Sequence, residues 1–418
     1  MKNKLRVLWF EISIPNKYYK TGNPTNGWQD SLEEIVRKDE RVELYISFEG
    51  KKDDKKKVID GVTYIPIVPK YSYLERLRNT MSWEVSRNIL IPMAVKVVEE
   101  IRPDIIQVFG SEWCWGQVQL YTNIPVVIHM QGSIPPYYNA RLPPNYSELD
   151  IVRYNGLNLR KQLISWMHRK KYKTWVDQEI RTLRSVRFYM GRTEWDKAIV
   201  SLYNSKAKYF YCSEALRPAI LNVNEGWKMN REKHTFRIIT TGVSTFWKGA
   251  DTILRTAILL KKLGFNFEWH LCGVMYVQNI IEYKEKNSFE ENNVRIHGFV
   301  NSDKLVELLL ESDLYVHTAY IDNSPNAICE AQYLGMPIIA TYVGGVPSLI
   351  EQGKDGVLIP ANDPFMLAEK ILQYSNNMSA FVYMGKASRN RAMHRHSPIN
   401  ITNDLFSCYQ AIIEETDV

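Results

Sequence analysis

A short stretch in the last quarter of the chain gathers residues that could bind a phosphate and hydroxyl groups. Residues 320–331 read Tyr-Ile-Asp-Asn-Ser-Pro-Asn-Ala-Ile-Cys-Glu-Ala. A predicted strand ends near Thr318, and a predicted helix starts near Pro325. A helix N-terminus presents unpaired backbone N–H groups and the positive end of the helix dipole, which suits a phosphate. The stretch therefore predicts an anion site, with the hydroxyl of Ser324 as a further donor.

Two carboxylates bracket this predicted helix start. Asp322 precedes it, and Glu330 follows about one turn into the helix. A carboxylate can accept hydrogen bonds from paired hydroxyl groups, as a ribose offers, so one acid could face a ribose and the other a sugar. Either acid alone is typical of a surface helix start. The ordered set with Gly335-Met336-Pro337 and Gly344-Gly345-Val346-Pro347 argues against that simpler interpretation.

The elements that must position these residues alternate between strand and helix patterns. This alternation predicts crossover connections and mostly parallel sheets, and therefore an α/β fold with two doubly wound domains. The predicted strands are Leu5–Phe10, Val42–Ser47, Val62–Pro66, Asp104–Gly110, Pro125–Gly132, Arg187–Gly191, Arg237–Thr241, Asn266–Cys272, Val294–Gly298, Leu314–Thr318, Pro337–Thr341 and Gly356–Ile359.

The break between the two domains falls around Cys212–His234, where no hydrophobic period is visible. We predict a first domain over residues 1–212 and a second over residues 213–399. The last helix, at about residues 400–418, is too short for a domain of its own and is expected to pack back on the first domain. The run Lys51–Lys57 is expected to be a solvated loop.

The composition is that of an ordinary globular protein. The chain has 418 residues, of which 45% are hydrophobic and 24% charged, which argues against disorder, collagen and coiled coil. No stretch approaches the roughly 18 apolar residues of a spanning helix, and residues 1–11 lack the pattern of a signal peptide. A cytoplasmic protein is expected. Five scattered cysteines without a Cys-x-x-Cys pair argue against disulfides and structural zinc.

The net charge of +7 is concentrated in one segment. Residues 153–192 hold eleven Lys or Arg residues against two acids. Trp166, Met167, Tyr172 and Trp175 lie among these bases. Basic residues with interfacial aromatics suit an anionic lipid surface, so residues 160–187 could dock on the inner face of a membrane; a solvated helix is the alternative. Nucleic acid is disfavoured because no recognised nucleic-acid module is present.

The stretch over residues 320–362 closely resembles the nucleotide-binding signature of retaining glycosyltransferases of family 4, which have the GT-B fold. That signature is a Glu, seven residues and a Glu; here it reads Asp322, seven residues and Glu330. The resemblance covers about residues 235–375 and extends more weakly over the first half. It implies two Rossmann-like domains facing across a cleft. It also implies retaining transfer of a hexose-type sugar from a nucleoside-diphosphate sugar to a glycan or lipid-linked acceptor, without a metal or other cofactor, in surface polysaccharide or glycolipid biosynthesis.

The resemblance also assigns roles to residues. Lys248 would pair with the diphosphate, Asp322 would orient the sugar and Glu330 would hold the ribose. The family usually has an arginine five residues before that lysine, where this chain has Val243. The full set of expected donor contacts is Gly27, Ser244, Lys248, His297, Gly298, Phe299, Asp322, Asn323, Ser324, Pro325, Asn326, Ala327 and Glu330.

Four residues that follow strands of the first domain are expected on the acceptor side. They are Glu112, Gln131, Arg192 and Thr193. His129 lies two residues before Gln131, and strand alternation allows either side chain to reach the cleft. Two other functions stay open at this stage: a sugar-nucleotide epimerase or phosphorylase of the same fold, and a non-catalytic partner subunit that binds a nucleotide or a membrane.

Overall fold

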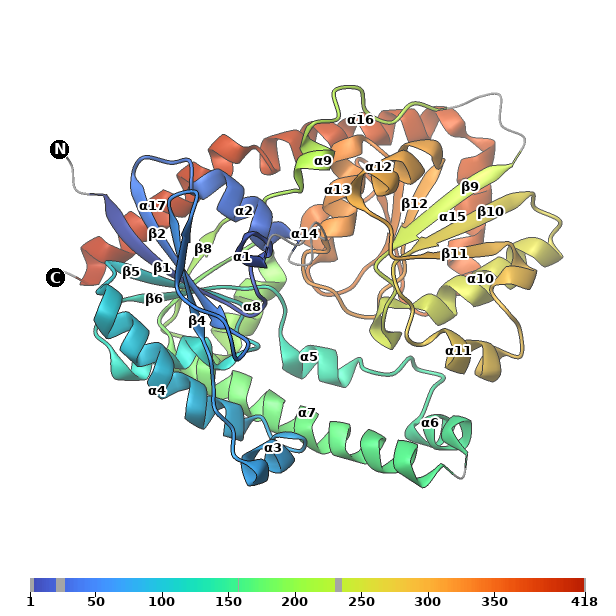
Figure 1. The fold of residues 1–418 in the computed structure, drawn as a ribbon. Coiled ribbons are helices and arrows are strands. Elements are labelled where there is room, and N and C mark those ends of the chain that lie inside the picture. Colours follow the sequence, from blue (N-terminus) through green and yellow to red (C-terminus); the bar gives the residue numbers. More distant parts are fainter. Residues whose placement is uncertain (1–3, 20–26, 157, 230–234, 417–418) are drawn as a thin grey trace. The chain divides into compact units, whose positions relative to one another are not determined.

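The computed structural model describes residues 4–19, 27–156, 158–229 and 235–416 (Figure 1). The chain divides into two compact units. The first unit comprises Met1–Tyr138, Leu159–Ala215 and Ser397–Val418. The second unit comprises Asn139–Asn158 and Leu216–His396.

Within the described residues, the first unit has a sheet of eight strands in the order β3-β4-β2-β1-β5-β6-β7-β8. All neighbouring strands pair in parallel except β3 and β4, which pair antiparallel. The strands are β1 (Leu5–Glu11), β2 (Val42–Glu49), β3 (Lys57–Ile59), β4 (Val62–Ile67), β5 (Ile105–Phe109), β6 (Val126–His129), β7 (Phe188–Gly191) and β8 (Lys208–Tyr211).

Helices cover both faces of this sheet, as residues of β1 show. Val7 and Trp9 join one buried hydrophobic cluster, and Leu8 and Phe10 join another. Successive side chains of a strand point to opposite faces, so both faces of the sheet are buried. The helical elements are α1 (Asn16–Tyr19), α2 (Trp28–Val36), α3 (Tyr73–Asn79), α4 (Glu84–Ile101), η1 (Cys114–Tyr121), α5 (Ile134–Asn139), α7 (Leu159–Ser185), α8 (Glu194–Tyr203) and α17 (Pro398–Thr416).

The second unit has a six-stranded parallel sheet in the order β11-β10-β9-β12-β13-β14 within the described residues. The chain builds outward from β9 in one direction and then starts again at β12 in the other. Such a reversal leaves a crevice at the carboxyl ends of the two central strands, where ligands bind in open α/β sheets. The strands are β9 (Phe236–Thr241), β10 (Phe267–Cys272), β11 (Val294–Gly298), β12 (Leu314–His317), β13 (Ile338–Thr341) and β14 (Val357–Ile359).

The helices of the second unit lie before, between and after these strands along the chain. They are α6 (Glu148–Asn155), α9 (Pro218–Leu221), η2 (Phe246–Lys248), α10 (Ala250–Lys262), α11 (Gln278–Glu285), η3 (Glu290–Asn292), α12 (Ser302–Glu311), α13 (Asn326–Leu334), α14 (Val346–Leu349), α15 (Pro364–Asn376) and α16 (Met378–Arg395). The Asp363 side chain caps α15 by accepting from the N–H of Met366 at 2.9 Å. The two doubly wound α/β units thus match the predicted fold class.

Residues 139–158 differ from the predicted domain boundaries. The chain leaves the first unit after Tyr138 and returns at Leu159, and the intervening residues pack with the second unit. Tyr146 is the reason, because its ring is buried in the core of the second unit 5.4 Å from the ring of Phe246. Its hydroxyl donates to Glu285 Oε1 at 3.0 Å. The prediction of an unbroken first domain over residues 1–212 is corrected accordingly.

The last helix, α17, packs in the first unit, as expected from the sequence. The indole N–H of Trp9 on β1 donates to the hydroxyl of Tyr409 at 3.1 Å. Ile401, Leu405 and Ile412 of the same helix are fully buried in the cluster that contains Trp9. In the part of the chain that the structure describes, no helix is long and apolar enough to cross a membrane.

Candidate active site

The candidate site lies where the central strands β9 and β12 of the second unit end. Lys248 follows β9, and Asp322 follows β12. The Nζ of Lys248 donates to Asp322 Oδ2 at 2.6 Å. The two residues are 74 positions apart in sequence, and the reversal of strand order at β9 and β12 brings them together. The structure therefore pairs the two groups that the sequence assigned to a diphosphate and a sugar.

Asp322 is held as a carboxylate in a buried position. Its side chain is 7% exposed, and burial alone would raise the pKa of Asp322. The charge of Lys248 and the imidazole of His317, whose Nε2 lies 3.2 Å from Oδ2, outweigh burial and hold the pKa of Asp322 well below its usual range. The N–H of Asn323 donates to the other oxygen at 3.1 Å. The sequence analysis missed His317 because it lies in a buried strand.

The loop that carries Lys248 is fixed against the loop after β12. The N–H of Tyr320 donates to the carbonyl of Trp247 at 2.7 Å, and the hydroxyl of Thr318 donates to the carbonyl of Gly249 at 3.0 Å. Gly249 has φ +76°, and a side chain there would collide with the carbonyl oxygen of Thr318. Only glycine fits this close approach, so the glycine after Lys248 serves to place the lysine.

A second close approach explains the predicted glycine pair. Gly344 has φ +49°, and a side chain there would collide with the carbonyl oxygen of Asp322. The N–H of Gly345 donates to that same oxygen at 2.9 Å. The loop after β13 therefore braces the backbone of Asp322 and fixes where its carboxylate points.

The N-terminus of α13 lies directly after these groups. Asn323 and Ser324 are buried, and Pro325 occupies the cap position, where it has no side chain that could cap the helix. Asn326 and Ala327 then supply the first helical N–H groups. This nine-residue helix thus offers backbone donors and a positive dipole end beside Lys248.

Glu330 lies inside α13 and pairs with an arginine that the sequence analysis did not assign. The Nε of Arg217 donates to Glu330 Oε1 at 2.6 Å. Burial raises the pKa of Glu330, and Arg217 opposes that rise without cancelling it. Val243, at the position where the family has an arginine, is 1% exposed and packs in the core cluster of the second unit. Arg217 is therefore a cation of this site that comes from a different part of the chain.

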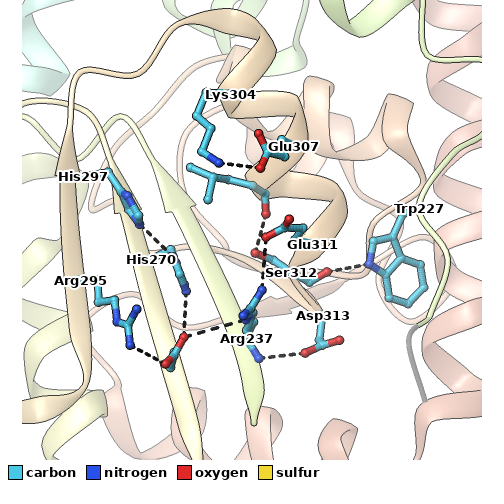
Figure 2. A network of polar contacts seen from close by, with 12 residues as sticks. Trp227, Arg237, His270, Arg295, His297, Lys304, Glu307, Glu311, Ser312 and Asp313 are labelled. Atoms are coloured by element: carbon cyan, nitrogen blue, oxygen red, sulfur yellow. Dashed lines mark hydrogen bonds and ion pairs between the residues drawn. The ribbon is translucent and has the colours of Figure 1, made fainter. Parts of the chain in front are cut away.

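The predicted base-binding segment lies at the end of β11. The ring of His297 stacks on that of His270, and the Nδ1 of His270 lies 2.8 Å from the Nε2 of His297 (Figure 2). His297 and Phe299 are exposed, and Gly298 is half-buried. Ser244 lies in the loop after β9, where its carbonyl accepts from the N–H of Tyr276 at 3.3 Å. These residues stay predictions for donor contacts.

Gly27 and the acceptor-side residues belong to the first unit. Gly27 occupies the cap position of α2, and residues 20–26 before it lie outside the described residues. Glu112 follows β5, Gln131 follows β6, and Arg192 and Thr193 follow β7. The guanidinium of Arg192 donates to the carbonyl of Gln131 at 3.1 Å. The structure thus brings two of the three strand-end segments into contact.

The structure gives His129 and Thr193 contacts within the first unit. His129 is fully buried, with its Nε2 3.3 Å from the carbonyl of Cys212, and burial lowers the pKa of His129 to about 3. His129 is therefore a neutral core residue. The hydroxyl of Thr193 caps α8 by accepting from the N–H of Asp196 at 3.2 Å. That cap accounts for Thr193 without an acceptor.

Near Glu112 lies a second buried carboxyl, that of Glu179, which the sequence pattern marked only as part of a charged stretch. Glu179 of α7 accepts from the hydroxyl of Ser111 and from the N–H of Ile134, each at 2.5 Å. Burial raises the pKa of Glu179, and the nearby Glu112 raises it further. A helix periodicity argument would not have found Glu179, because its partners lie 45 and 68 residues away in sequence.

A comparison with protein families matches part of the second unit. Residues 224–391 match the family described as glycosyl transferases group 1. The chain is 25% identical over 182 residues to the putative colanic acid biosynthesis glycosyltransferase WcaL of Escherichia coli, which covers 42% of this chain and 45% of that protein. The chain thus spans less than half the length of that relative.

Two solved structures are similar over nearly the whole chain. A sucrose-phosphate synthase from Thermosynechococcus elongatus has a TM-score of 0.71 at 13% identity, covering 99% of this chain and 100% of that one. HepE from Anabaena in complex with UDP-glucose has a TM-score of 0.65 at 14% identity, covering 99% of each chain. At such low identity these likenesses show the fold, which is that of the GT-B proteins.

Proposed function

We propose that the chain is a glycosyltransferase of polysaccharide biosynthesis, because residues 224–391 match the family described as glycosyl transferases group 1. It transfers a hexose-type sugar from a nucleoside-diphosphate sugar to a glycan or lipid-linked acceptor, with retention of configuration. The observation that carries the proposal is the buried pair of Lys248 and Asp322 beside the N-terminus of α13. The relatives' names support it, since WcaL is named a putative colanic acid biosynthesis glycosyltransferase and HepE was solved in complex with UDP-glucose.

Each charged group then has a role in transfer. The bond between the sugar's anomeric carbon and the diphosphate oxygen breaks, and a bond from that carbon to the acceptor oxygen forms on the same face. The departing diphosphate takes the acceptor proton. Lys248 and the N–H groups at Asn326 and Ala327 stabilise the charge that develops on the leaving group. Asp322 orients the sugar hydroxyls, and Glu330 accepts from the ribose.

The reaction is proposed to need no metal, because Lys248 and the α13 N-terminus together supply the positive charge that the diphosphate needs. The test is release of nucleotide from UDP-, GDP- and ADP-sugars in the presence of EDTA, with and without an added glycan acceptor. Acceptor-dependent release is expected. Conversion of the donor without any acceptor would instead indicate an epimerase. Binding of a nucleotide without turnover would indicate a partner subunit.

Part of α7 is proposed to dock the enzyme on an anionic membrane. Leu159, Leu163 and Trp166 are exposed at helical spacing on one stripe, with 82%, 55% and 41% exposure. The exposed bases around this stripe are Arg160, Lys161, Lys170 and Lys173. An exposed apolar stripe flanked by cations is the pattern of an interfacial helix. Lys171 is excluded from this surface because it lies over the ring of Trp83 at 4.3 Å.

Charge reversal tests this docking surface. Replacing Arg160, Lys161, Lys170 and Lys173 by Glu should abolish binding to liposomes that contain anionic phospholipid, while transfer to a soluble acceptor persists. The matched control reverses four exposed lysines outside α7, namely Lys4, Lys38, Lys52 and Lys96. Equal liposome binding by the two quadruple variants would contradict the assignment.

A further inference from the structure

Arg217 occupies a fixed position at the start of the second unit. It caps α9, a four-residue helix, and its neighbours Leu216 and Ile220 are buried in a hydrophobic cluster with Ile328 and Ala331 of α13. The backbone on both sides of Arg217 is therefore anchored against the helix that carries Glu330.

The contacts of Arg217 join two segments of the predicted donor site. Its Nε lies 2.6 Å from Glu330 Oε1, and its Nη1 lies 3.4 Å from the hydroxyl of Ser302. Ser302 begins α12, which follows the segment of His297, Gly298 and Phe299. The Arg217 side chain is 29% exposed, whereas that of Glu330 is 5% exposed. Arg217 is thus the more accessible partner of a largely buried ion pair.

Arg217 affects both the protonation and the orientation of the Glu330 carboxyl group. A buried carboxyl without a cation tends to keep its proton, and a protonated carboxyl has fewer oxygens free to accept. The carboxylate form offers about four acceptor positions. One is used by Arg217 Nε, which leaves room for two hydroxyl donors. A planar guanidinium also fixes the orientation of the carboxylate better than a flexible ammonium would.

We propose that Arg217 is a positioning residue for the nucleoside end of the donor: through its ion pair with Glu330 it presents that carboxylate, ionised and oriented, to the ribose diol of a nucleoside diphosphate. This inference rests on the proposed function, because Glu330 was assigned to the ribose there. Arg217 acts on the ribose and not on the diphosphate.

Ligand analogues separate this role from a general structural one. The dissociation constants of UDP, GDP and ADP, and of their 2′,3′-dideoxy forms, are measured by calorimetry for the wild type, R217Q and R217K. Loss of a hydrogen bond to a charged group should weaken binding of the best ribonucleotide by about tenfold or more in R217Q. The dideoxy form should bind the wild type and R217Q equally, because it lacks the hydroxyls that Glu330 would accept. R217K should fall between the wild type and R217Q.

The control is R391Q, which breaks another arginine–carboxylate pair in the same unit. Arg391 Nη1 lies 2.8 Å from Asp355 Oδ2, and neither residue belongs to the proposed site. R391Q should lower the midpoint of thermal unfolding and leave nucleotide affinity unchanged. Equal ribonucleotide affinity of R217Q and the wild type, or an equal loss for ribo and dideoxy forms, would overturn the inference alone. A wild-type chain that binds no nucleotide would overturn the proposed function as well.

Discussion

Both sheets have carboxyl groups at the point where the strand order reverses, but the surroundings of these groups differ between the two units. At the switch point of the second unit, Asp322 and Glu330 each contact a cation at 2.6 Å. At the switch point of the first unit, Glu11 ends β1 and Glu112 follows β5. Burial raises the pKa of both of these carboxyls, and the neighbouring Glu33 raises that of Glu11 further. Arg192 acts on Glu112 only through its charge.

This difference indicates which class of ligand suits the strand ends of each unit. In the second unit each carboxyl has a cation as a direct partner, Lys248 for Asp322 and Arg217 for Glu330, next to donors for a phosphate, which suits a charged nucleotide. In the first unit burial raises the pKa of Glu11 and of Glu112, which favours the protonated form more than at Asp322, and a protonated carboxyl can both donate to and accept from hydroxyl groups. A hydroxyl-rich, uncharged glycan suits that edge better than an anion does. The contrast predicts that the donor site depends on its cations. It also predicts that the stability of the first unit depends on the protonation of its buried carboxyls.

The largest expected effect comes from Lys248→Met. Removing one partner of a buried ion pair leaves Asp322 uncompensated, which should cost about 3 kcal/mol in the free energy of unfolding. Loss of leaving-group stabilisation should reduce turnover by roughly 100-fold or more. Urea unfolding and nucleotide release measure the two effects.

The pH dependence of this variant follows from the lowered pKa of Asp322. A carboxyl with a lowered folded pKa contributes stability above its unfolded pKa of about 4, and that contribution is lost as the pH falls. The stability gap between Lys248→Met and the wild type should therefore be widest near neutral pH and narrow in acid. Lys284→Met, which breaks the pair of Lys284 with Asp150 in the same unit, should leave turnover unchanged. Normal turnover in Lys248→Met would contradict the assigned role.

A smaller effect on stability but a large one on activity is expected from Glu330→Ala. Turnover should fall below detection, because the ribose would lose its acceptor. Glu330→Gln keeps the shape and should be nearly as inactive, and it should lose less stability than Lys248→Met because the Arg217 side chain that loses its partner is 29% exposed. Steady-state release of nucleotide provides the measurement. Undiminished activity in either variant would refute the ribose assignment.

The first unit should show the opposite pH dependence, and Glu33 tests it. Glu33 accepts from the hydroxyl of Tyr64 at 2.5 Å, and burial raises the pKa of Glu33 to about 7. Its folded pKa lies above the unfolded one, so its contribution to stability is complete below pH ~4.5 and is lost as the pH rises towards 7. The raised pKa of Glu33 contributes up to about 3 kcal/mol to the free energy of unfolding, at about 1.4 kcal/mol per pKa unit.

Glu33→Gln removes this titration and keeps an acceptor for Tyr64. Urea unfolding at pH 5 and pH 8 should show the variant gaining on the wild type as the pH rises. The exposed Glu99→Gln serves as the control and should follow the wild type at both pH values. A gap between Glu33→Gln and the wild type that does not change with pH would show that Glu33 is ionised throughout.

The smallest effect on donor binding is expected from Arg192→Gln. Arg192 is 5% exposed and lies over the ring of Trp28 at 5.0 Å, so the variant should lose some stability through packing. Nucleotide affinity should be unchanged, whereas the KM for the acceptor should rise. A parallel loss of nucleotide affinity would remove the contrast between the two edges.

Much of the donor side could be predicted from the sequence because its signals are local. The glycine after Lys248, the glycine pair at residues 344–345 and the proline before α13 each mark a turn or a helix start, and the structure gives each a geometric reason. The strand order could not be read from local patterns, yet it is what brings Lys248 to Asp322. The resemblance to a known family supplied that arrangement.

The residues that the sequence did not reveal share a physical cause. Arg217 lies in a segment without hydrophobic period, and its partner is 113 residues away. Glu179 lies in a basic stretch that was interpreted through its charge, although the side chain is fully buried. Tyr146 lies inside the first domain's sequence but packs in the second unit's core. Long-range pairing and crossing of a domain boundary leave no local signature.

The most direct test of the donor site is a thermal-shift panel of UDP, GDP, ADP and their sugar conjugates in EDTA, run on the wild type and Lys248→Met. A ligand at about 100 times its dissociation constant adds about 2.7 kcal/mol of stability. We expect one nucleotide class to raise the unfolding temperature of the wild type, and that rise to be lost in Lys248→Met. No shift with any nucleotide, or an equal shift in both proteins, would contradict the site described above.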